Sequence, residues 1–182
     1  MPQIKKRKKF FDVEIPLIKT TTQLQAVEKE ELEGRIILYD LTRILKGKSA
    51  ILQLKVKVKG DEITTIPRKI QLLPYFIRRM LRKGTNYVED SFSTECKDAI
   101  VRIKPFLVTR RKVSRAIRTA LRIKAREELV NYAKDRESEK IFDDILKNNI
   151  QRYLSSALKK VYPLSFCDIR IFQVEKEKAK IE

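Results

Sequence analysis

Residues 52–59 alternate strictly between aliphatic and polar side chains, and this pattern places the firmest constraint on the fold. The segment reads, in order, Leu52, Gln53, Leu54, Lys55, Val56, Lys57, Val58 and Lys59. Because successive side chains of a strand point to opposite faces, it predicts a strand with one apolar and one cationic face. The cationic face is interpreted as solvated, or as an edge protected against aggregation. Residues 59–62 predict a turn, and residues 63–66 a return strand that closes a hairpin.

Five further segments have the aliphatic and aromatic composition of strands. They are residues 10–18, 35–39, 87–92, 99–108 and 167–174. A turn is expected at residues 96–98, between the third and the fourth of them. Residues 20–33 are polar without a regular pattern, and they predict a loop. Leu41, Ile44 and Leu45 stand at helical spacing, so residues 40–46 predict one short turn of helix.

Apolar residues recur every three or four positions in two regions, and this spacing predicts helices. In the first region the apolar stripe is Ile70, Leu73, Ile77, Met80 and Leu81. The helix is expected to begin at or near Pro74, because proline is tolerated in a first turn, and to stop at Gly84. The second region begins near Lys112, breaks at Asn148 and ends before Pro163. Its stripes are Val113, Ile117, Leu121, Ala125, Leu129 and Tyr132, then Ile141, Phe142, Ile145 and Leu146, then Tyr153, Leu154, Leu158 and Val161. The aromatic residues on or beside helical stripes are interpreted as core: Phe76, Tyr132, Phe142 and Tyr153.

The order of these elements predicts the fold class. Strands, one helix, strands, helices and a last strand do not alternate regularly, as a doubly wound fold would require. We therefore expect an α+β fold, with a mostly antiparallel β-sheet or small β-barrel-like core and helices packed on one side. The 182 residues suit one ordinary domain, and the 4 glycines and 6 prolines argue against a long disordered linker.

The charge balance indicates a polyanionic partner. Lysine and arginine number 42 against 24 acids, which gives a net charge of +18. Such a charge weakens the compact state by self-repulsion unless a polyanion neutralises it, and nucleic acid does so by releasing its condensed counterions. An anionic membrane would normally be met by an amphipathic helix with bulky aromatics. No run approaches the ~20 apolar residues that cross a bilayer, and no targeting segment is visible, so we expect a cytoplasmic protein.

The densest basic cluster lies in residues 99–126, which contain no acid. Its members are Arg102, Lys104, Arg110, Arg111, Lys112, Arg115, Arg118, Arg122, Lys124 and Arg126. On a helix that begins near Lys112, four of these line one face: Arg111, Arg115, Arg118 and Arg122. Arginine grips phosphate through two N–H donors at once. A solvated helix face is the alternative, but it would normally carry acids as well, so contact with RNA or DNA is favoured.

Two smaller basic clusters accompany it. One is Arg78, Arg79, Arg82 and Lys83, in a stretch without acids between Ile63 and Val88. The other is the block formed by Lys5, Lys6, Arg7, Lys8 and Lys9. This block could thread along nucleic acid, resemble a nuclear import signal, or act only as a solubilising arm.

Catalytic and metal-binding patterns are scarce. The chain has no histidine, and Cys96 and Cys167 lack metal-ligand spacing, so we expect two reduced thiols and no cofactor. The adjacent acids at 127–128 and 143–144 lie on predicted helices, where neighbours point in different directions. A two-metal nuclease would need carboxylates that converge from separate elements. We expect no enzyme, although a metal-dependent nuclease that uses Asp143 or Asp144 stays a minor alternative.

Several stretches, in matching order over almost the whole chain, resemble the archaeal and eukaryotic small-subunit ribosomal protein family known as S-one-e or S-three-Ae. They are residues 8–13, 32–36 with Leu41, 77–85, 97–105, 161–164 and 168–170. The family's Arg-Arg-Gly-Thr motif maps onto residues 82–85, and its Lys-Asp-x-x-x-x-Arg motif maps onto Lys97 to Arg102. Ala99 replaces the usual turn glycine, and residues 72–74 depart from the common helix start.

The resemblance implies a structural protein with a β-barrel-like core flanked by helices and without catalytic residues. It implies a place on the platform of the small subunit, near the 3′ end of its rRNA and the mRNA exit. The expected partners are small-subunit rRNA, neighbouring ribosomal proteins and mRNA near the exit, with no membrane and no small-molecule substrate. The short tail resembles archaeal members.

The chain is thus expected to have three parts. They are a basic arm at residues 1–9, a single RNA-binding α+β domain at residues 10–174 and a charged tail at residues 175–182. The alternative to a ribosomal protein is a free-standing nucleic-acid-binding regulator or chromatin-type protein.

Overall fold

The alternating segment forms strand β4 (Ala50–Lys59), as its pattern predicts. Leu52, Leu54 and Val56 are fully buried, whereas on the other face Lys55 is half-buried and Lys57 and Lys59 are exposed. Gly60 then turns the chain with a positive φ of 60°, a conformation that glycine adopts without steric cost. The return strand β5 (Glu62–Leu72) is confirmed, but it runs six residues past the predicted end at residue 66.

The computed structural model describes residues 7–45, 47–60 and 62–177. The chain divides into two compact units. The N-terminal unit comprises Met1–Tyr39 and Leu52–Arg68, and the C-terminal unit comprises Asp40–Ile51 and Lys69–Glu182. The expected assignment of residues 10–174 to one RNA-binding domain stays a prediction, and β9 (Leu164–Glu177) continues past its boundary.

The N-terminal unit is a small sheet around its own core. Strands β1 (Lys9–Ile15) and β2 (Thr20–Ala26) form an antiparallel hairpin, and β1 pairs in parallel with β5. Strand β3 (Ile36–Asp40) pairs with β4, which gives the order β2-β1-β5-β4-β3. The core consists of Val13, Ala26, Leu32, Val56 and Ile63.

The expected loop at residues 20–33 is wrong, because β2 and a 3-10 helix, η1 (Lys29–Leu32), occupy it. In β2 the inward positions are Thr20, Thr22, Leu24 and Ala26, so two of the four are polar and the alternation is hidden. The first strand also ends at Ile15 instead of near Lys19. The intervening residues form a turn, and Lys19 has a φ of 55°.

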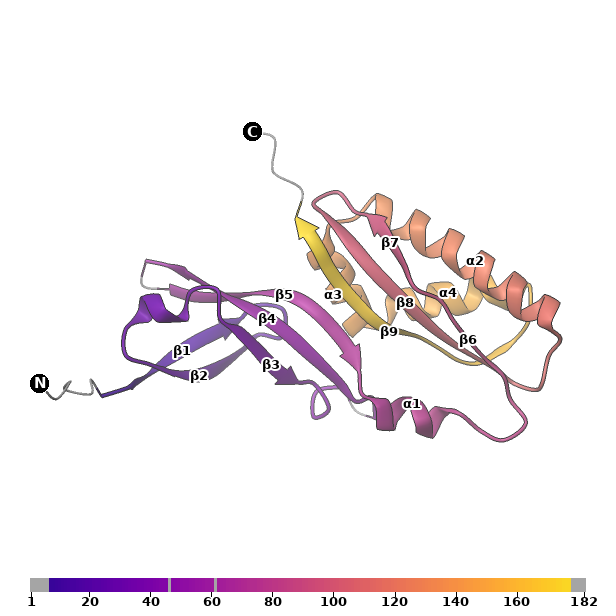
Figure 1. The fold of residues 1–182 in the computed structure, drawn as a ribbon, viewed down its shortest axis with the longest axis horizontal. Helices are drawn as coiled ribbons and strands as arrows, with labels where there is room; N and C mark the ends of the chain where they lie inside the picture. The colour runs from indigo at the N-terminus through magenta and orange to yellow at the C-terminus, as the bar shows by residue number, and fades with distance from the viewer. Residues whose placement is uncertain (1–6, 46, 61, 178–182) are drawn as a thin grey trace, which may run out of the picture. The chain divides into compact units, whose positions relative to one another are not determined.

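The described part of the C-terminal unit combines antiparallel strands with helices (Figure 1), and the end of β5 pairs there with β9 through residues 69–71. Strand β8 (Ala99–Thr109) pairs along its length with β9, and on its other edge with β6 (Tyr87–Glu89) and β7 (Phe92–Glu95). Helix α2 (Arg115–Lys134) packs on β6 and β7, while α3 (Ser138–Leu146) and α4 (Asn149–Lys159) pack on β9. An open, mostly antiparallel sheet with helices confirms the expected α+β class.

Helix α1 (Pro74–Met80) begins at Pro74, as predicted, but it does not reach Gly84. Leu81 already has extended backbone angles, and Gly84 lies in the following turn with a φ of 88°. Ile70, which was expected on the helical stripe, belongs to β5. The short helical turn expected at residues 40–46 is present as a bond from the Leu45 N–H to the Leu41 carbonyl, 2.8 Å long.

Helix α2 begins three residues later than Lys112, because Ser114 caps it. The Ser114 hydroxyl accepts a hydrogen bond from the Ile117 N–H at 3.4 Å, which satisfies one of the free donors of the first turn. Leu121, Ala125 and Leu129 are buried, as the stripe predicts.

The helical break at Asn148 is confirmed, since this residue takes the left-handed conformation between α3 and α4. Phe142 is fully buried, and its ring meets that of Phe172 edge-on at 4.8 Å, so α3 is held against β9. Tyr153 is 44% exposed, however, and the prediction that it belongs to the core is wrong. It lies at the edge of α4, where its hydroxyl donates to Glu128 at 2.6 Å. No described helix is long and apolar enough to cross a membrane.

Candidate nucleic-acid interface

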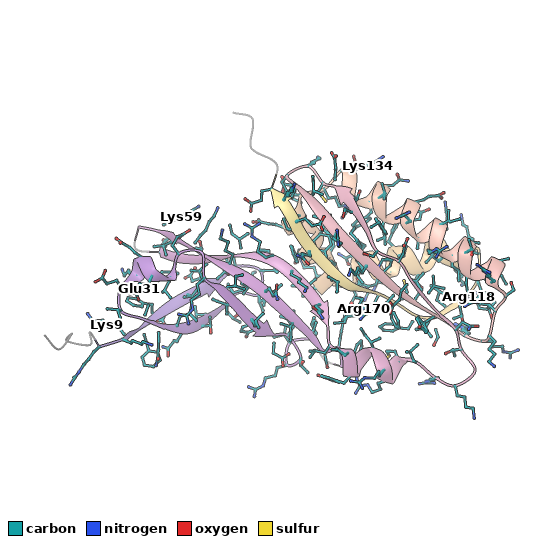
Figure 2. All side chains as sticks on the ribbon, viewed as in Figure 1. Lys9, Glu31, Lys59, Arg118, Lys134 and Arg170 are labelled. Atoms are coloured by element: carbon teal, nitrogen blue, oxygen red, sulfur yellow. The ribbon has the colours of Figure 1, made fainter. Side chains whose placement is uncertain are left out.

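The exposed face of α2 carries three arginines in its first two turns. Arg115, Arg118 and Arg122 are all exposed and step by three and four residues, so they share one side of the helix. Figure 2 labels Arg118 near the beginning of α2. Leu121 and Ala125 are buried and lie three residues after Arg118 and Arg122, so the arginines flank the buried stripe of the helix. The helix therefore places all three arginines along one border of its packed face.

These arginines and strand β6 border a hollow of about 260 Å³. It is lined by Tyr87, Val88, Glu89, Arg115, Arg118, Thr119 and Arg122. Glu89 is the acid of this lining, and its carboxylate accepts from the Arg170 guanidinium at 3.0 Å. No ion pair joins the three lining arginines to any carboxylate that the structure describes. The hollow therefore has uncompensated positive charge.

Tyr87 gives the hollow an exposed aromatic side chain. It is 55% exposed, although its ring stacks on that of the fully buried Phe106 at 6.1 Å and 30°. Phe106 in turn packs edge-on against Phe166, and Phe166 against Phe76. Tyr87 is thus the exposed end of an aromatic row. The sequence reasoning missed this residue, because nothing in the local pattern distinguishes it from an ordinary strand tyrosine.

Three basic residues of the acid-free stretch have acidic partners from elsewhere in the chain. Arg102 pairs with Glu175 at 2.7 Å, and Arg126 pairs with Asp90 at 3.6 Å. Lys124 pairs with Glu128 at 3.1 Å, and this hydrogen bond raises the pKa of the lysine. The fold therefore divides the predicted cluster into compensated and uncompensated members.

Arg111 is not on the helical face to which its spacing assigned it. It precedes α2, and its carbonyl accepts from the Thr109 hydroxyl at 2.7 Å, which holds the segment in a non-helical turn. Arg110, Arg111 and Lys112 are exposed in this connection between β8 and α2. Lys104 is half-buried on β8, and Lys97 is exposed in the turn that precedes this strand.

The second predicted cluster lies on and just after α1. Arg78, Arg79, Arg82 and Lys83 are all exposed. Arg79 also has local partners, since its guanidinium donates to the Gly47 carbonyl at 3.4 Å and lies 5.5 Å from the centre of the Phe76 ring.

The predicted arm is described only in part. Arg7, Lys8 and Lys9 are exposed, and Lys9 is the first residue of β1. Lys5 and Lys6 lie outside the described residues. The arm belongs to the N-terminal unit, whereas the other two clusters belong to the C-terminal unit.

The acidic pair on α3 is engaged by hydrogen bonds and cations. Asp143 pairs with Lys147 at 2.5 Å. Asp144 accepts from the Tyr132 hydroxyl at 2.8 Å, from Arg136 at 2.5 Å and from the Asn149 amide at 3.0 Å. Burial alone would raise the pKa of Asp144, but these hydrogen bonds and the Arg136 charge outweigh it and lower the pKa. The described residues contain no group of three or more metal-ligating side chains.

Cys96 is buried and Cys167 is half-buried, and the structure joins neither in a disulfide. Burial, with the nearby charge of Asp168, raises the pKa of Cys167 to about 12. A thiol with this pKa is almost entirely protonated near neutral pH, so it is a poor nucleophile and a poor metal ligand.

Comparisons with known proteins agree with the resemblance seen in the sequence. The profile of the Ribosomal S3Ae family matches residues 4–178. The chain is similar to small ribosomal subunit protein eS1 of Nanoarchaeum equitans, with 30% identity over 93% of this chain and 90% of the relative. It is also similar to eS1 of Pyrobaculum aerophilum, with 27% identity over 93% and 80%, and to eS1 of Pyrobaculum arsenaticum, with 24% over 87% and 76%. A match over nearly the whole chain means that this protein belongs to the Ribosomal S3Ae family.

Proposed function

We propose that this protein is a structural constituent of the small ribosomal subunit, acting in translation by binding small-subunit rRNA. The observation that carries the proposal is the face formed by Arg115, Arg118 and Arg122, which is exposed and lacks any carboxylate partner among the described residues. The names of the archaeal relatives support the ribosomal assignment.

The physical role follows from the charge. A protein with a net charge of +18 gains free energy when phosphates replace its counterions, and RNA gains from the release of its own. On α2 the helix places the three arginines along one side, so they can contact neighbouring phosphates together. Arginine adds directional, paired hydrogen bonds to this attraction.

The family resemblance extends the proposal to a location. It supports a position on the platform near the mRNA exit, beside other ribosomal proteins. The remaining predicted contacts, on α1, in the 110–112 connection and in the arm, are part of the same proposal. No catalytic step is assigned, because Asp143 and Asp144 each have a cationic partner at 2.5 Å.

The test compares two variants that lose the same charge. In the α2-face variant, Arg115, Arg118 and Arg122 are each changed to Gln. In the matched control, Arg102, Lys124 and Arg126 are changed to Gln, because their charges already have acidic partners. Binding of each purified protein to a small-subunit rRNA fragment is measured over a range of KCl concentrations.

Removing one cation that neutralises a phosphate should flatten the log–log salt dependence by ~0.7–0.9 units, so the slope of the α2-face variant should fall by about 2 to 3 units. The slope of the control should fall clearly less. An α2-face variant that keeps its full slope, or a control whose slope falls as much, would remove this face from the interface.

Sedimentation of a lysate tests the ribosomal assignment separately. The protein should travel with the small-subunit peak and leave it only at high salt. A protein found only in the free fraction would favour a free-standing nucleic-acid regulator. Divalent-metal cleavage of RNA that disappears in Asp143→Asn or Asp144→Asn would instead favour a nuclease.

A further inference from the structure

We infer that the hollow between α2 and β6 holds one unpaired nucleotide of RNA, with its base stacked on Tyr87 and its flanking phosphates on Arg115, Arg118 and Arg122. This inference rests on the proposed RNA binding and specifies the RNA structure that this site accepts. The site is expected to bind an unstacked nucleotide in a loop, bulge or single strand, and not the regular surface of a duplex.

The shape of the site favours an unpaired nucleotide. A regular duplex keeps its bases paired and stacked, so it offers this site only backbone and groove edges and no free base face. Here the arginines border a concave space of about 260 Å³ whose opposite side is formed by Tyr87, Val88 and Glu89. A base that has left its stack can enter such a space, while its phosphates stay at the rim.

Tyr87 is suited to receive a base. Aromatic side chains bind unstacked bases through their flat faces, with little dependence on which base is present. Tyr87 is 55% exposed, and its ring stacks on that of Phe106. Its backbone is fixed, because Tyr87 pairs with Val108 in the β6–β8 ladder. Little conformational freedom is therefore lost when a base stacks on it.

The charges of the hollow also fit. Phosphate would be repelled by an unpaired carboxylate, but Glu89 is bound to the Arg170 guanidinium at 3.0 Å. Three arginines against one neutralised acid leave the space strongly cationic. Arginine and an exposed aromatic side by side are the combination that binds single-stranded nucleic acid without a sequence requirement.

The experiment uses the full chain with two probes, a short single-stranded RNA and the same strand in a duplex. Tyr87→Leu keeps apolar bulk but removes the flat ring, and Tyr87→Phe keeps the ring. For the single strand, Tyr87→Leu should weaken binding about 5- to 150-fold, the range that loss of one base stack produces. Duplex binding should change less than about twofold, and Tyr87→Phe should bind both probes as wild type does.

Intrinsic fluorescence gives a second readout. The chain has 6 tyrosines and no tryptophan, so its emission comes from tyrosine alone. Stacking on Tyr87 should quench up to about a sixth of this emission when the single strand binds. In Tyr87→Phe this component should vanish although affinity is kept. Far-UV circular dichroism of each variant shows whether the fold is intact.

The outcomes separate this inference from the proposed function. A Tyr87→Leu variant that folds and binds the single strand like wild type overturns the stacked nucleotide, as does equal weakening for both probes. The salt slope should be unaltered in Tyr87→Leu, because no charge is removed. If the α2-face variant loses its slope while Tyr87→Leu has no effect, RNA binding stands and only the nucleotide site fails.

Discussion

Lys48 and Asp168 form a buried ion pair in the C-terminal unit, and removing the lysine should be costly. Asp168 lies on β9 and is 3% exposed. Its carboxylate accepts from the Lys48 ammonium at 2.7 and 2.9 Å, from the Gln151 amide at 3.0 Å and from the Ile169 N–H at 2.7 Å. The pair thus ties the segment before β4 to α4 and β9.

The magnitude follows from what Lys48→Met leaves behind. The variant keeps the length of the side chain but leaves the Asp168 carboxylate buried without its cation. Breaking a buried ion pair in this way costs about 3–5 kcal/mol. Two neutral hydrogen bonds to Asp168 remain, and the Lys48 side chain is 13% exposed, so some water can enter. We therefore expect a loss near the lower limit, about 3 kcal/mol.

A matched control is the exposed pair of Lys147 and Asp143, with side chains that are 63% and 41% exposed. The same change, Lys147→Met, should cost less than about 0.5 kcal/mol, because water screens the pair and solvates the remaining acid. Free energies of unfolding come from urea titrations followed by far-UV circular dichroism, with m-values compared between variants.

A double variant tests the cause. Asp168→Asn removes the buried charge, so Lys48→Met with Asp168→Asn should be more stable than Lys48→Met alone. A Lys48→Met variant that loses no more than Lys147→Met, or a double variant in which the two losses simply add, would refute the argument that an unpaired buried carboxylate is responsible.

Three other outcomes are expected. The raised pKa of Cys167, about 12, and the burial of Cys96 should keep both thiols unreactive toward a disulfide reagent at pH 8 until urea is added, and fast labelling of the folded protein would contradict this. Burial and the hydrogen bond to Asp144 raise the pKa of Tyr132 to about 12, so the stability that Tyr132 contributes should be complete below pH 10.0 and lost as pH rises toward 12. Absorbance titration and unfolding at each pH would measure this, and ionisation of all tyrosines near pH 10 would disprove it. Ser114→Ala should cost about 1 kcal/mol in urea unfolding through loss of the α2 cap, and an unchanged midpoint would speak against that cap.

The sequence pattern correctly predicted those strands and helices in which the buried residues recur at the period of the strand or the helix. Strand β4 and the buried stripe of α2 are of this kind, because a single repeating face meets the core. The pattern failed in β2, where Thr20 and Thr22 take inward positions and pairing with β1, not hydrophobicity, specifies the strand. It failed again at Gly84, because the helix ends where Leu81 turns to extended backbone.

The candidate interface was predictable only in part. The absence of acids from residues 99–126 is a local property, so the sequence reveals the basic stretch. Which of its charges are compensated is a tertiary property: Arg102 and Glu175 are 73 positions apart in the chain, yet they pair at 2.7 Å. Asp168 was recognised only within a family motif, although an acid within an apolar strand is a signal for a buried pair.

The beginning of α2 also breaks a local rule of helix stability, and this supports an anionic partner. A helix N-terminus carries partial positive charge, so acids are favoured in the first turn and cations are disfavoured there. The first turn of α2 instead holds Arg115 and Arg118 and no acid, while Ser114 satisfies the backbone through a neutral cap. Isolated, this arrangement costs stability, since the helix dipole and the arginines repel each other. With a phosphate at the face, the dipole and both guanidinium groups become attractive together. Repulsion in the free protein that a bound anion converts to attraction is expected at an anion-binding surface, and folding alone gives no reason for it.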